Sequence, residues 1–291
     1  MNKTVFVVIV TYNGAHWMDK NIQSLLNSSY QVKIIVADNC STDDTVSVVE
    51  KYPEVTFLKM TSNLGFGKAN NIGIKEALEK GADYVFLLNQ DAWVFNDTVG
   101  NLIQVMEKDT GIGLVSPMHY IADEVTLDSN FKTYLDRGVP FHNSQSLIQV
   151  TFVNAAAWML SRECIEKTGY FEPLFGHYGE DRNYCDRVLY HGFSIVINEY
   201  SKIVHDRVIT RNFKKDIIQC RYKLLTTLLN INHGLAKSYM LGLKDVLGLT
   251  KYFSKFYGFG KSVKLFFNLF GYYIGLMFKS GQIITARNNA K

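Results

Sequence analysis

Four runs of mainly apolar residues, rich in valine and isoleucine, recur through the first ninety residues of the chain. They cover residues 5–10, 32–37, 55–60 and 84–88. A strand that is buried on both faces of a parallel sheet shows this continuous pattern. Apolar positions with helical spacing separate the runs, most clearly over residues 16–26 and 68–80. Strands that alternate with helices predict an α/β fold with a doubly wound, mostly parallel sheet.

The middle of the chain has a less regular pattern. Residues 115–150 mix short β-prone pieces with polar loops. Beyond them, the pattern predicts a short helix from Ser161, a helix over residues 182–190 and a strand over residues 194–197. A glycine-rich loop over residues 175–179 leads into the second of these helices.

Residues 214–291 differ from the rest in composition and charge. They contain 13 Lys and Arg against two acids, Asp216 and Asp245, which gives this part a charge of +11, leaves −7 for residues 1–213 and makes the whole chain +4. The longest apolar stretch, over residues 265–278, is interrupted by polar and glycine residues and falls short of the roughly 20 residues that a spanning helix needs. We therefore expect this basic, amphipathic, helical tail to lie on an anionic membrane surface.

Lysines in the tail recur among apolar residues at spacings that would place cations at the level of lipid headgroups and aromatic rings just below. The lysines are Lys244, Lys251, Lys255, Lys261 and Lys264, and the apolar residues are Leu249, Phe253, Phe256, Phe259, Leu265 and Phe266. The alternative is that these apolar residues pack on the rest of the protein and that the lysines form its solvated face.

Composition places the chain among globular proteins of the cytoplasm. Its 291 residues, 47% of them hydrophobic and 20% charged, are enough for a sizeable core. The four cysteines are far apart and show no C-x-x-C spacing, so we expect neither a disulfide framework nor a zinc site, and a reducing compartment fits. The apolar run at residues 5–10 is too short for a cleavable signal.

Polar residues follow two of the predicted strands at the point where each strand ends. Asp38 comes directly after the second run, and Asn89, Gln90 and Asp91 end the fourth. Open α/β sheets bind their ligands outside the carboxyl ends of the strands. A carboxylate there is the hard oxygen ligand that a Mg²⁺ or Mn²⁺ ion holding a diphosphate prefers. The sequence therefore predicts such a site at this edge of the sheet.

Five motifs follow one another along the chain. They are Val-Ile-Val-Thr-Tyr-Asn at 8–13, Ala-Asp-Asn-Cys-Ser-Thr-Asp at 37–43, Asn-Leu-Gly-Phe-Gly at 63–67 with Asn-Asn-Ile-Gly at 70–73, Leu-Leu-Asn-Gln-Asp at 87–91, and Glu-Asp at 180–181 with Cys185 and Arg187. Together they resemble the family 2 glycosyltransferases of the GT-A fold, and among these the bacterial rhamnosyltransferase-like branch. The resemblance covers about residues 4–225.

This resemblance implies an inverting transfer of a sugar from a nucleoside-diphosphate donor to a hydroxyl of a growing cell-surface glycan. The acceptor would be carried on a polyprenyl lipid, so the enzyme would be peripheral at the inner face of the cell membrane. Rhamnose is the sugar that the branch suggests, and another hexose stays open. We predict a GT-A domain over residues 1–213, with a nucleotide-sugar half (1–110) and an acceptor half (111–213), followed by the tail (214–291).

The first four motifs carry the donor-binding residues that the resemblance implies. They are Thr11, Tyr12, Asn13, Asp38, Asn39, Asn63, Gly65, Phe66, Asn70, Asn89 and Gln90. Asp38 would accept a hydrogen bond from a pyrimidine N3–H, and the glycines at 65 and 67 would let the backbone approach phosphate or sugar closely. Read from the residues alone, Asp38 is also a helix-capping turn residue, and residues 63–67 are also an ordinary strand-to-helix loop.

Asp91 is the predicted ligand of a Mn²⁺ or Mg²⁺ ion, and His205 would complete the metal or diphosphate site. The cation would neutralise the charge that grows on the departing nucleoside diphosphate. Asn89, Gln90 and Asp91 stand in place of the D-x-D motif of the family, a variant that looks like that of the rhamnosyltransferase-like branch. The alternatives are a strand-end turn for Asp91 and a purely structural role for His205.

Asp181 is the predicted base, and Glu180 beside it is predicted to bind the acceptor. An inverting transfer needs a carboxylate that takes the proton of the acceptor hydroxyl. Two acids at a helix start are also ordinary complements of the helix dipole. Asn183 replaces the second Asp of the signature. Trp158 is predicted to stack on an acceptor sugar, with core packing as the alternative.

Two other functional classes compete with the glycosyltransferase. A glycoside hydrolase would use Glu180 and Asp91 as its carboxylate pair and would leave Asp38 and residues 63–67 without a role. A nucleic-acid-binding module would use the basic tail, but lysines spaced among Leu and Phe fit an interfacial helix better, so we expect no nucleic-acid partner. The absence of a Q-x-x-R-W motif disfavours a processive synthase. Homo-oligomerisation is left open.

Overall fold

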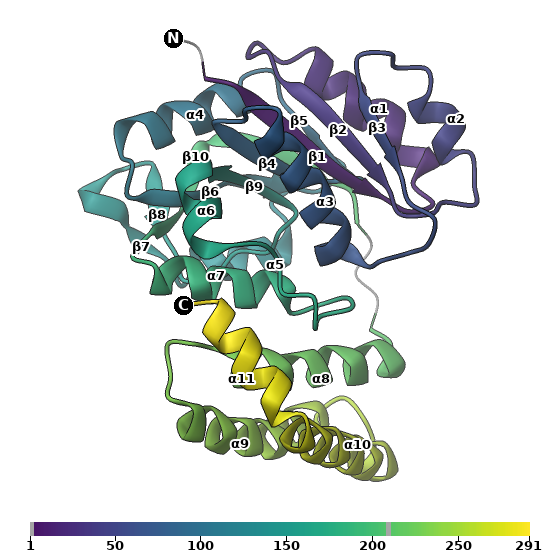
Figure 1. The fold of residues 1–291 in the computed structure, drawn as a ribbon, viewed down its shortest axis with the longest axis vertical. Coiled ribbons are helices and arrows are strands. Elements are labelled where there is room, and N and C mark those ends of the chain that lie inside the picture. Colours follow the sequence, from purple (N-terminus) through teal and green to yellow (C-terminus); the bar gives the residue numbers. More distant parts are fainter. Residues whose placement is uncertain (1–2, 208–210) are drawn as a thin grey trace.

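The computed structural model describes residues 3–207 and 211–291, and in these residues ten strands form one sheet with helices on both faces (Figure 1). The strands are β1 (Val5–Thr11), β2 (Lys33–Asp38), β3 (Thr56–Lys59), β4 (Tyr84–Asn89), β5 (Ala92–Val94), β6 (Ile112–Tyr120), β7 (Val139–Pro140), β8 (Leu147–Gln149), β9 (Ala157–Ser161) and β10 (Ser194–His205). The helices of this sheet domain are α1 (Ala15–Leu26), α2 (Thr45–Val49), α3 (Phe66–Glu79), α4 (Thr98–Lys108), α5 (Ser129–Leu135), η1 (Phe141–Asn143), α6 (Arg162–Thr168) and α7 (Glu180–Tyr190).

The strand order is β3-β2-β1-β4-β9-β6-β10-β8-β7, with β5 pairing with β10. The first four strands in this order are parallel, and β6 and β10 are also parallel to each other. Strand β9 is antiparallel to both β4 and β6 and joins the two groups. The predicted α/β fold with a mostly parallel central sheet is confirmed.

Strand β1 lies in the middle of the parallel group, and its alternating side chains enter two hydrophobic cores. Val7 and Ile9 pack with residues of α1 and α4, whereas Phe6 and Val8 pack with residues of α3, α6 and α7. This two-sided burial explains the continuous apolar run in the sequence. The register pairs Thr11 with Asp38 and Val10 with Asn89, so polar strand ends from three elements meet at one edge.

The part of the chain that the pattern left unassigned contains β6, α5, β7, η1 and β8. The strand predicted over residues 194–197 is much longer in the structure, because β10 runs to His205. A register shift between Asn198 and Lys202 interrupts its pairing with β6. This polar interruption is the reason that the sequence pattern predicted a strand over residues 194–197 alone.

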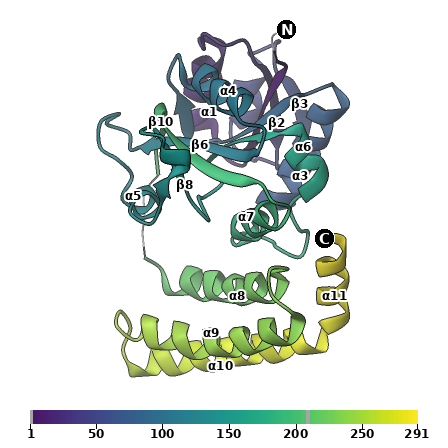
Figure 2. The ribbon, with the colours of Figure 1, turned by 90° about the vertical axis from the view of Figure 1, so that its left-hand side faces the viewer.

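Residues 213–289 form a separate helical layer of four helices beneath the sheet domain in Figures 1 and 2. They are α8 (Phe213–Leu229), α9 (Leu235–Phe253), α10 (Phe259–Phe278) and α11 (Ser280–Asn289). Figure 2 shows α8 between the sheet domain and the α9–α10 pair. Leu224 and Leu228 of α8, Val246 of α9 and Leu269 of α10 are fully buried and share one core. The layer is therefore a packed bundle.

Helix α11 turns back from the outer pair toward the sheet domain. Its Arg287 is buried and donates hydrogen bonds of 2.7 Å to the carbonyl oxygens of Leu228 and Asn230. The imidazole Nε2 of His191, at the end of α7, lies 3.1 Å from the carbonyl oxygen of Ala290. These contacts tie the far end of the helical layer to α8 and to the sheet domain.

Candidate active site

A cleft of about 590 Å³ opens at the carboxyl edge of β1, β2 and β4. Its walls come from three strand ends, from the loop over residues 63–67 and from the loop over residues 175–179. The lining residues are Val10, Tyr12, Asn39, Asn63, Leu64, Gly65, Phe66, Asn89, Gln90, Asp91, Gly176 and His177. The cleft therefore lies where the sequence placed it, and eight predicted site residues line it: Tyr12, Asn39, Asn63, Gly65, Phe66, Asn89, Gln90 and Asp91.

Gln90 connects the end of β4 to the end of β1. Its Oε1 accepts hydrogen bonds from the Thr11 hydroxyl (2.9 Å) and from the Tyr12 backbone N–H (2.8 Å). Thr11 is completely buried, so it acts on the cleft through Gln90. The Tyr12 ring is 44% exposed and is free to contact a ligand in the cleft. These two hydrogen bonds hold the end of β4 against the end of β1 at the base of the cleft.

Asn39 holds the 63–67 loop against the end of β2. Its Nδ2 donates to Asn63 Oδ1 (3.0 Å), and its Oδ1 accepts from the Leu64 backbone N–H (2.7 Å). Asp38 is buried beside it and accepts from the Ser41 backbone N–H at 3.1 Å. The contact between Asp38 and a nucleotide base therefore stays a prediction, because the carboxylate lies behind the cleft wall.

Asn13 and Asn70 lie outside the lining of the cleft. Asn13 has a left-handed backbone (φ 50°), and its Oδ1 accepts from the Thr42 backbone N–H at 2.8 Å, which joins the β1 and β2 loops. Asn70 is 2% exposed and donates to the Phe66 carbonyl oxygen within α3. Asn70 does not line the cleft, and its contact with the donor stays a prediction.

Asp91 and His205 lie side by side, as predicted. The Asp91 Oδ1 and His205 Nε2 atoms are 3.4 Å apart. Strand β5 brings them together, because its Ala92 pairs with His205 at the end of β10. The turn is held further by the Asp206 backbone N–H, which donates to the Asp91 carbonyl oxygen at 2.8 Å, and by Trp17 Nε1, which donates to Asp206 at 3.0 Å.

The Asp91 and His205 pair fits a divalent cation that is shared with a ligand. His205 is 2% exposed, and its Nε2 is the ring nitrogen that faces the Asp91 carboxylate, so the pair offers one imidazole nitrogen and one carboxylate, both of which divalent cations accept as ligands. Asp91 lines the cleft, so its carboxylate is accessible to an ion there. The described residues contain no group of three or more His, Cys, Asp or Glu side chains arranged for a metal. The remaining ligands of a six-coordinate ion would come from a bound diphosphate and water.

The 63–67 and 175–179 loops touch at the mouth of the cleft. Gly65 has φ +82°, and a Cβ atom added to it would lie 2.1 Å from the Gly176 carbonyl oxygen. Gly67 faces α7, because a Cβ atom there would lie 3.7 Å from the Cβ and Cγ atoms of Glu180. Glycine is required at position 65 by both the left-handed conformation and the close approach. The approach of Gly67 to Glu180 places the start of α7 beside the 63–67 loop of the cleft.

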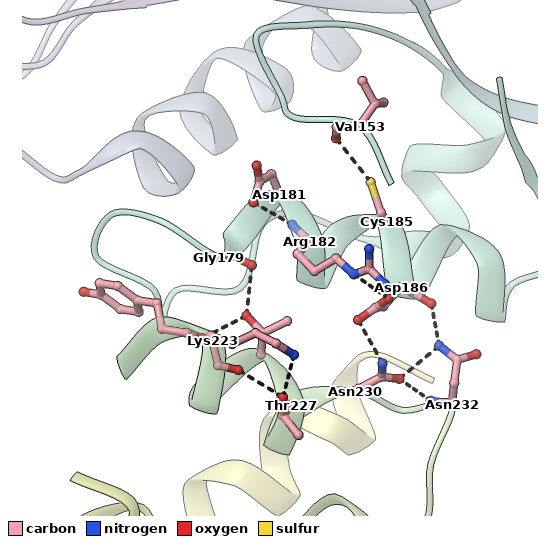
Figure 3. Close-up of polar contacts among 12 residues, drawn as sticks. Val153, Gly179, Asp181, Arg182, Cys185, Asp186, Lys223, Thr227, Asn230 and Asn232 are labelled. Carbon is pink, nitrogen blue, oxygen red and sulfur yellow. Dashed lines mark hydrogen bonds and ion pairs between the residues drawn. The ribbon is translucent and has the colours of Figure 1, made fainter. Parts of the chain in front are cut away.

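Glu180 and Asp181 begin α7 after the left-handed Gly179. Glu180 is 4% exposed, and its Oε2 has no hydrogen-bond partner within the described ranges. Burial and the neighbouring Asp181 charge raise the pKa of Glu180 to about 7. Burial raises the pKa of Asp181 to about 6, although Asp181 Oδ1 accepts a hydrogen bond from the Arg182 backbone N–H (Figure 3). Carboxylates tuned toward neutral pH are suited to proton transfer.

Helix α8 of the helical layer supports the loop that precedes these acids. The Gly176 backbone N–H donates to the Tyr222 hydroxyl oxygen at 3.1 Å, and the Thr226 hydroxyl donates to the Gly179 carbonyl oxygen at 3.3 Å. Phe175 is buried in the core that α8 shares with α9 and α10. The conformation of the loop thus depends on residues more than forty positions later in the chain.

Trp158 lies in the core and has no exposed surface. Its ring packs 6.2 Å from the Phe171 ring in a stacked arrangement and 5.9 Å from the Tyr184 ring. Strand β9, which carries it, is buried between β4 and β6. The prediction that Trp158 stacks on an acceptor sugar is therefore wrong for this structure, and the alternative of core packing holds.

Sequence reasoning assigned no role to Gly176, His177, Tyr222 and Thr226. Gly176 and His177 line the cleft, while Tyr222 and Thr226 hold the 175–179 loop. The signal for the first pair was the glycine-rich composition of that loop. Nothing local marks Tyr222 and Thr226, because their partners lie in a distant segment.

A model of glycosyl transferase family 2 matches residues 6–169, which is more than half of the chain. The chain belongs to glycosyl transferase family 2. This membership confirms the predicted family and makes the protein a glycosyltransferase. It decides against the glycoside hydrolase.

Two relatives of this family 2 glycosyltransferase are similar in sequence. The dTDP-rhamnosyl transferase RfbF of Shigella flexneri is 28% identical over 214 residues, which cover 70% of each chain. The N-acetylglucosaminyl-diphospho-decaprenol L-rhamnosyltransferase of Mycobacterium tuberculosis is 29% identical over 128 residues, 40% of this chain and 42% of the relative. The predicted likeness to rhamnosyltransferases is confirmed.

A solved structure shares the fold over nearly the whole chain. The mannosyltransferase PcManGT from Pyrobaculum calidifontis, in complex with GDP-Man and Mn²⁺, superposes with a TM-score of 0.63 over 98% of this chain and 86% of its own. The two sequences are 17% identical. This likeness establishes a shared fold.

Proposed function

We propose that this family 2 glycosyltransferase performs an inverting transfer of a sugar from a nucleoside-diphosphate donor to an acceptor hydroxyl, with Asp181 as the base. The observation that carries the proposal is the position of the Glu180–Asp181 pair. The pair begins α7, directly after the 175–179 loop that lines the cleft, Glu180 lies next to Gly67, and both carboxyl groups have raised pKa values. A base with a pKa about one unit below neutral pH is mostly ionised and still accepts a proton effectively.

In this proposal the residues of the cleft bind the donor, and the acids at the start of α7 act on the acceptor. The nucleotide would lie along Tyr12, Asn39 and the 63–67 loop, with its diphosphate toward Asp91. Asp91 and His205 would hold Mn²⁺ or Mg²⁺, which when bound supplies positive charge to the leaving diphosphate. Asp181 would take the proton from the acceptor hydroxyl, and Glu180 would accept a hydrogen bond from the acceptor.

The donor is most simply a nucleoside-diphosphate rhamnose. The similarity to the dTDP-rhamnosyl transferase RfbF over 70% of each chain supports this choice over another hexose. The acceptor class follows from the mycobacterial relative, whose name describes transfer to a sugar on a diphosphate-linked polyprenol. We therefore include in the proposal a lipid-linked, growing cell-surface glycan as acceptor, and a peripheral position at the cytoplasmic face of the membrane.

A donor panel tests the proposal. Purified protein is incubated with dTDP-rhamnose, UDP-glucose, UDP-galactose and UDP-N-acetylglucosamine, with a lipid-linked acceptor and Mn²⁺, and release of nucleoside diphosphate is measured. We expect release from dTDP-rhamnose, and a product whose anomeric configuration, read by NMR, is opposite to that of the donor. Retention of configuration, or no release from any nucleotide sugar, would contradict the proposal.

A matched pair of variants tests the role of Asp181. Asp181→Asn should keep donor binding and lower turnover by roughly 100-fold or more, the usual scale for loss of a general base. Asp186→Asn is the control, because it makes the same chemical change five residues later in α7, where Oδ2 accepts a hydrogen bond from Asn230 that an amide oxygen also accepts (Figure 3). Equal loss of turnover in both variants would assign the effect to the helix and move the base elsewhere.

A further inference from the structure

The helical layer has an apolar face that no described residue covers. On α9 it contains Met240, Leu243 and Leu247, which are 43–66% exposed, and on α10 it contains Phe259, Val263, Phe267, Phe270, Met277 and Phe278, which are 37–87% exposed. We call these nine residues the outer face. Phe259 and Phe278 are each 87% exposed, so most of each ring is open to solvent. Contiguous exposed apolar side chains of this kind mark an interaction surface.

The outer face is a regular stripe along both helices. At 3.6 residues per turn, the six residues of α10 fall within an arc of about 100° around the helix axis, and the three of α9 fall within about 60°. Phe259 and Phe278 stand at the two ends of α10, so the stripe is roughly 28 Å long. Gly271 and Gly275 have no atoms within 4 Å of an added Cβ, which shows that this side of α10 is open.

The outer face points away from the rest of the protein. Helices α9 and α10 pack against α8 through the opposite side, where Val246, Leu265 and Leu269 are buried. Figure 2 shows the α9–α10 pair as the part of the chain farthest from the sheet. Four of the six apolar residues expected to meet a membrane, Leu249, Phe253, Leu265 and Phe266, turn inward to this core, and that part of the prediction is wrong.

Lysines flank the stripe, and acids are missing from it. Lys244 lies next to Leu243 and Lys251 lies four residues after Leu247 on α9, and Lys264 lies next to Val263 on α10; all three are exposed. The two acids of the helical layer point inward. Asp245 accepts a hydrogen bond from Thr227 at 2.6 Å, and Asp216 is 7% exposed beside Arg211. The surroundings of the outer face are therefore uniformly positive.

We propose that the outer face of α9 and α10 docks flat on an anionic lipid bilayer, with its aromatic side chains inserted below the headgroups and Lys244, Lys251 and Lys264 at headgroup level. This inference rests on the proposed function for its biological setting and names the partner surface of the enzyme. No helix in the described part of the chain is long and apolar enough to cross a membrane, so the contact is interfacial. A second copy of the chain is a poorer occupant, because two lysine-flanked faces repel each other.

Co-sedimentation with vesicles tests the docking. The full-length protein is mixed at low salt with vesicles of phosphatidylcholine alone and with vesicles that also contain phosphatidylglycerol. We expect binding to the anionic vesicles that weakens as salt is added, because exposed charges are screened. Point substitutions are preferable to truncation after Ile231, because removal of α9 and α10 would expose Leu224 and Leu228 of α8.

Two triple variants separate the apolar and electrostatic parts. Phe259→Ser, Phe267→Ser and Phe278→Ser together should lower the partition coefficient by on the order of 100-fold or more, because three large apolar side chains no longer insert. Lys244→Glu, Lys251→Glu and Lys264→Glu together should lower it by a similar order on anionic vesicles. Two controls change exposed positions of the sheet domain. Val125→Ser with Tyr200→Ser replaces two exposed apolar side chains by serine, and Lys51→Glu with Lys108→Glu and Lys132→Glu makes the same three charge reversals; both should leave binding unchanged.

Three outcomes would overturn the docking. They are failure of the wild type to bind anionic vesicles at low salt, equal loss of binding in the controls, and a stable dimer in sedimentation velocity that the phenylalanine variant dissolves. Donor binding is measured by calorimetry on the same preparations. Because this measurement does not depend on vesicles, it tests the proposed function separately from the docking. Vesicle binding without any nucleotide-sugar binding would contradict the proposed function and leave the docking intact.

Discussion

The hydroxyl group of Tyr222 accepts a hydrogen bond from the backbone N–H of Gly176 at 3.1 Å. The bond joins α8 to the loop that carries the cleft residue His177 and leads directly into Glu180 and Asp181. A Cβ atom on Gly176 would lie 2.6 Å from the same hydroxyl, so the loop and the helix are in close contact. The helical layer therefore helps to position the acids that we assign to the acceptor side.

Tyr222→Phe tests this positioning. The substitution keeps the ring and removes the acceptor of the Gly176 N–H, at a cost of about 1 kcal/mol or roughly fivefold in turnover. We expect kcat for a soluble acceptor to fall severalfold while the KM for the donor changes little. Tyr200→Phe, on an exposed tyrosine of β10, is the control. A change in donor KM with unchanged kcat would show that the contact serves the donor cleft instead.

Gly65→Ala tests the contact between the 63–67 and 175–179 loops. The added methyl group would meet the Gly176 carbonyl oxygen at 2.1 Å, so the loops must separate, and both donor affinity and turnover should fall by about tenfold or more. Gly81→Ala is a closely matched control, because Gly81 has φ +84° and nothing within 4 Å of an added Cβ. It adds a methyl group at a positive φ without the collision. If both variants lose activity equally, backbone strain alone explains the effect.

The pH dependence of turnover should reflect Asp181. Because its pKa is raised to about 6 and the base must be ionised, kcat/KM should fall about tenfold per pH unit below pH 6. Glu180, with a pKa of about 7, is expected to contribute a second transition. The pH–rate profile of Asp181→Asn should lack the limb near pH 6 in its residual activity. An unchanged profile would assign that limb to another group.

The same raised pKa values predict how stability depends on pH. The folded state holds protons on Glu180 and Asp181 more tightly than the unfolded state, so their contribution to stability is fully present at low pH and is lost as the pH rises to about 7. Asp181→Asn should therefore raise the unfolding free energy by about 1–2 kcal/mol at pH 8. Below pH 4 the gain should vanish. Denaturant titrations at the two pH values measure this difference.

Metal binding is tested at Asp91. Asp91→Ala should abolish most binding of Mn²⁺ in the presence of nucleoside diphosphate and lower turnover by on the order of 1000-fold, because the diphosphate charge is left unpaired in the cleft. Electron paramagnetic resonance of Mn²⁺ measures the binding directly. Asp136→Ala, at an exposed position after α5, is the control. Full activity of the wild type in excess EDTA would rule out the metal role.

The first four strands and the polar ends of β2 and β4 could be predicted from the sequence because their signals are local. A continuous apolar run that stops at Asp38 or Asn89 shows both the buried strand and its edge. Since the parallel register aligns these ends, the positions of Tyr12, Asn39 and Asp91 at one cleft followed directly.

The errors concern residues whose surroundings come from distant segments. Trp158 is buried because Phe171 and Tyr184 lie against it, and no pattern around residue 158 reveals those partners. The prediction of which apolar residues of the tail face a membrane was wrong for another reason. Helix α10 has apolar residues on both its inner and its outer side, so its periodicity alone does not tell which side meets α8. Only the packing of the layer separates Leu265 and Phe266 from Phe267 and Phe270.

The position of α8 between the outer face and the 175–179 loop has a consequence for the length of the acceptor. Packed helices have axes about 8–10 Å apart, so an enzyme resting on α9 and α10 holds Gly179 roughly 15–20 Å above the headgroups. The helical layer then acts as a spacer. A lipid-linked acceptor must then raise its hydroxyl to this height, which a longer glycan does more readily than a single sugar on its diphosphate.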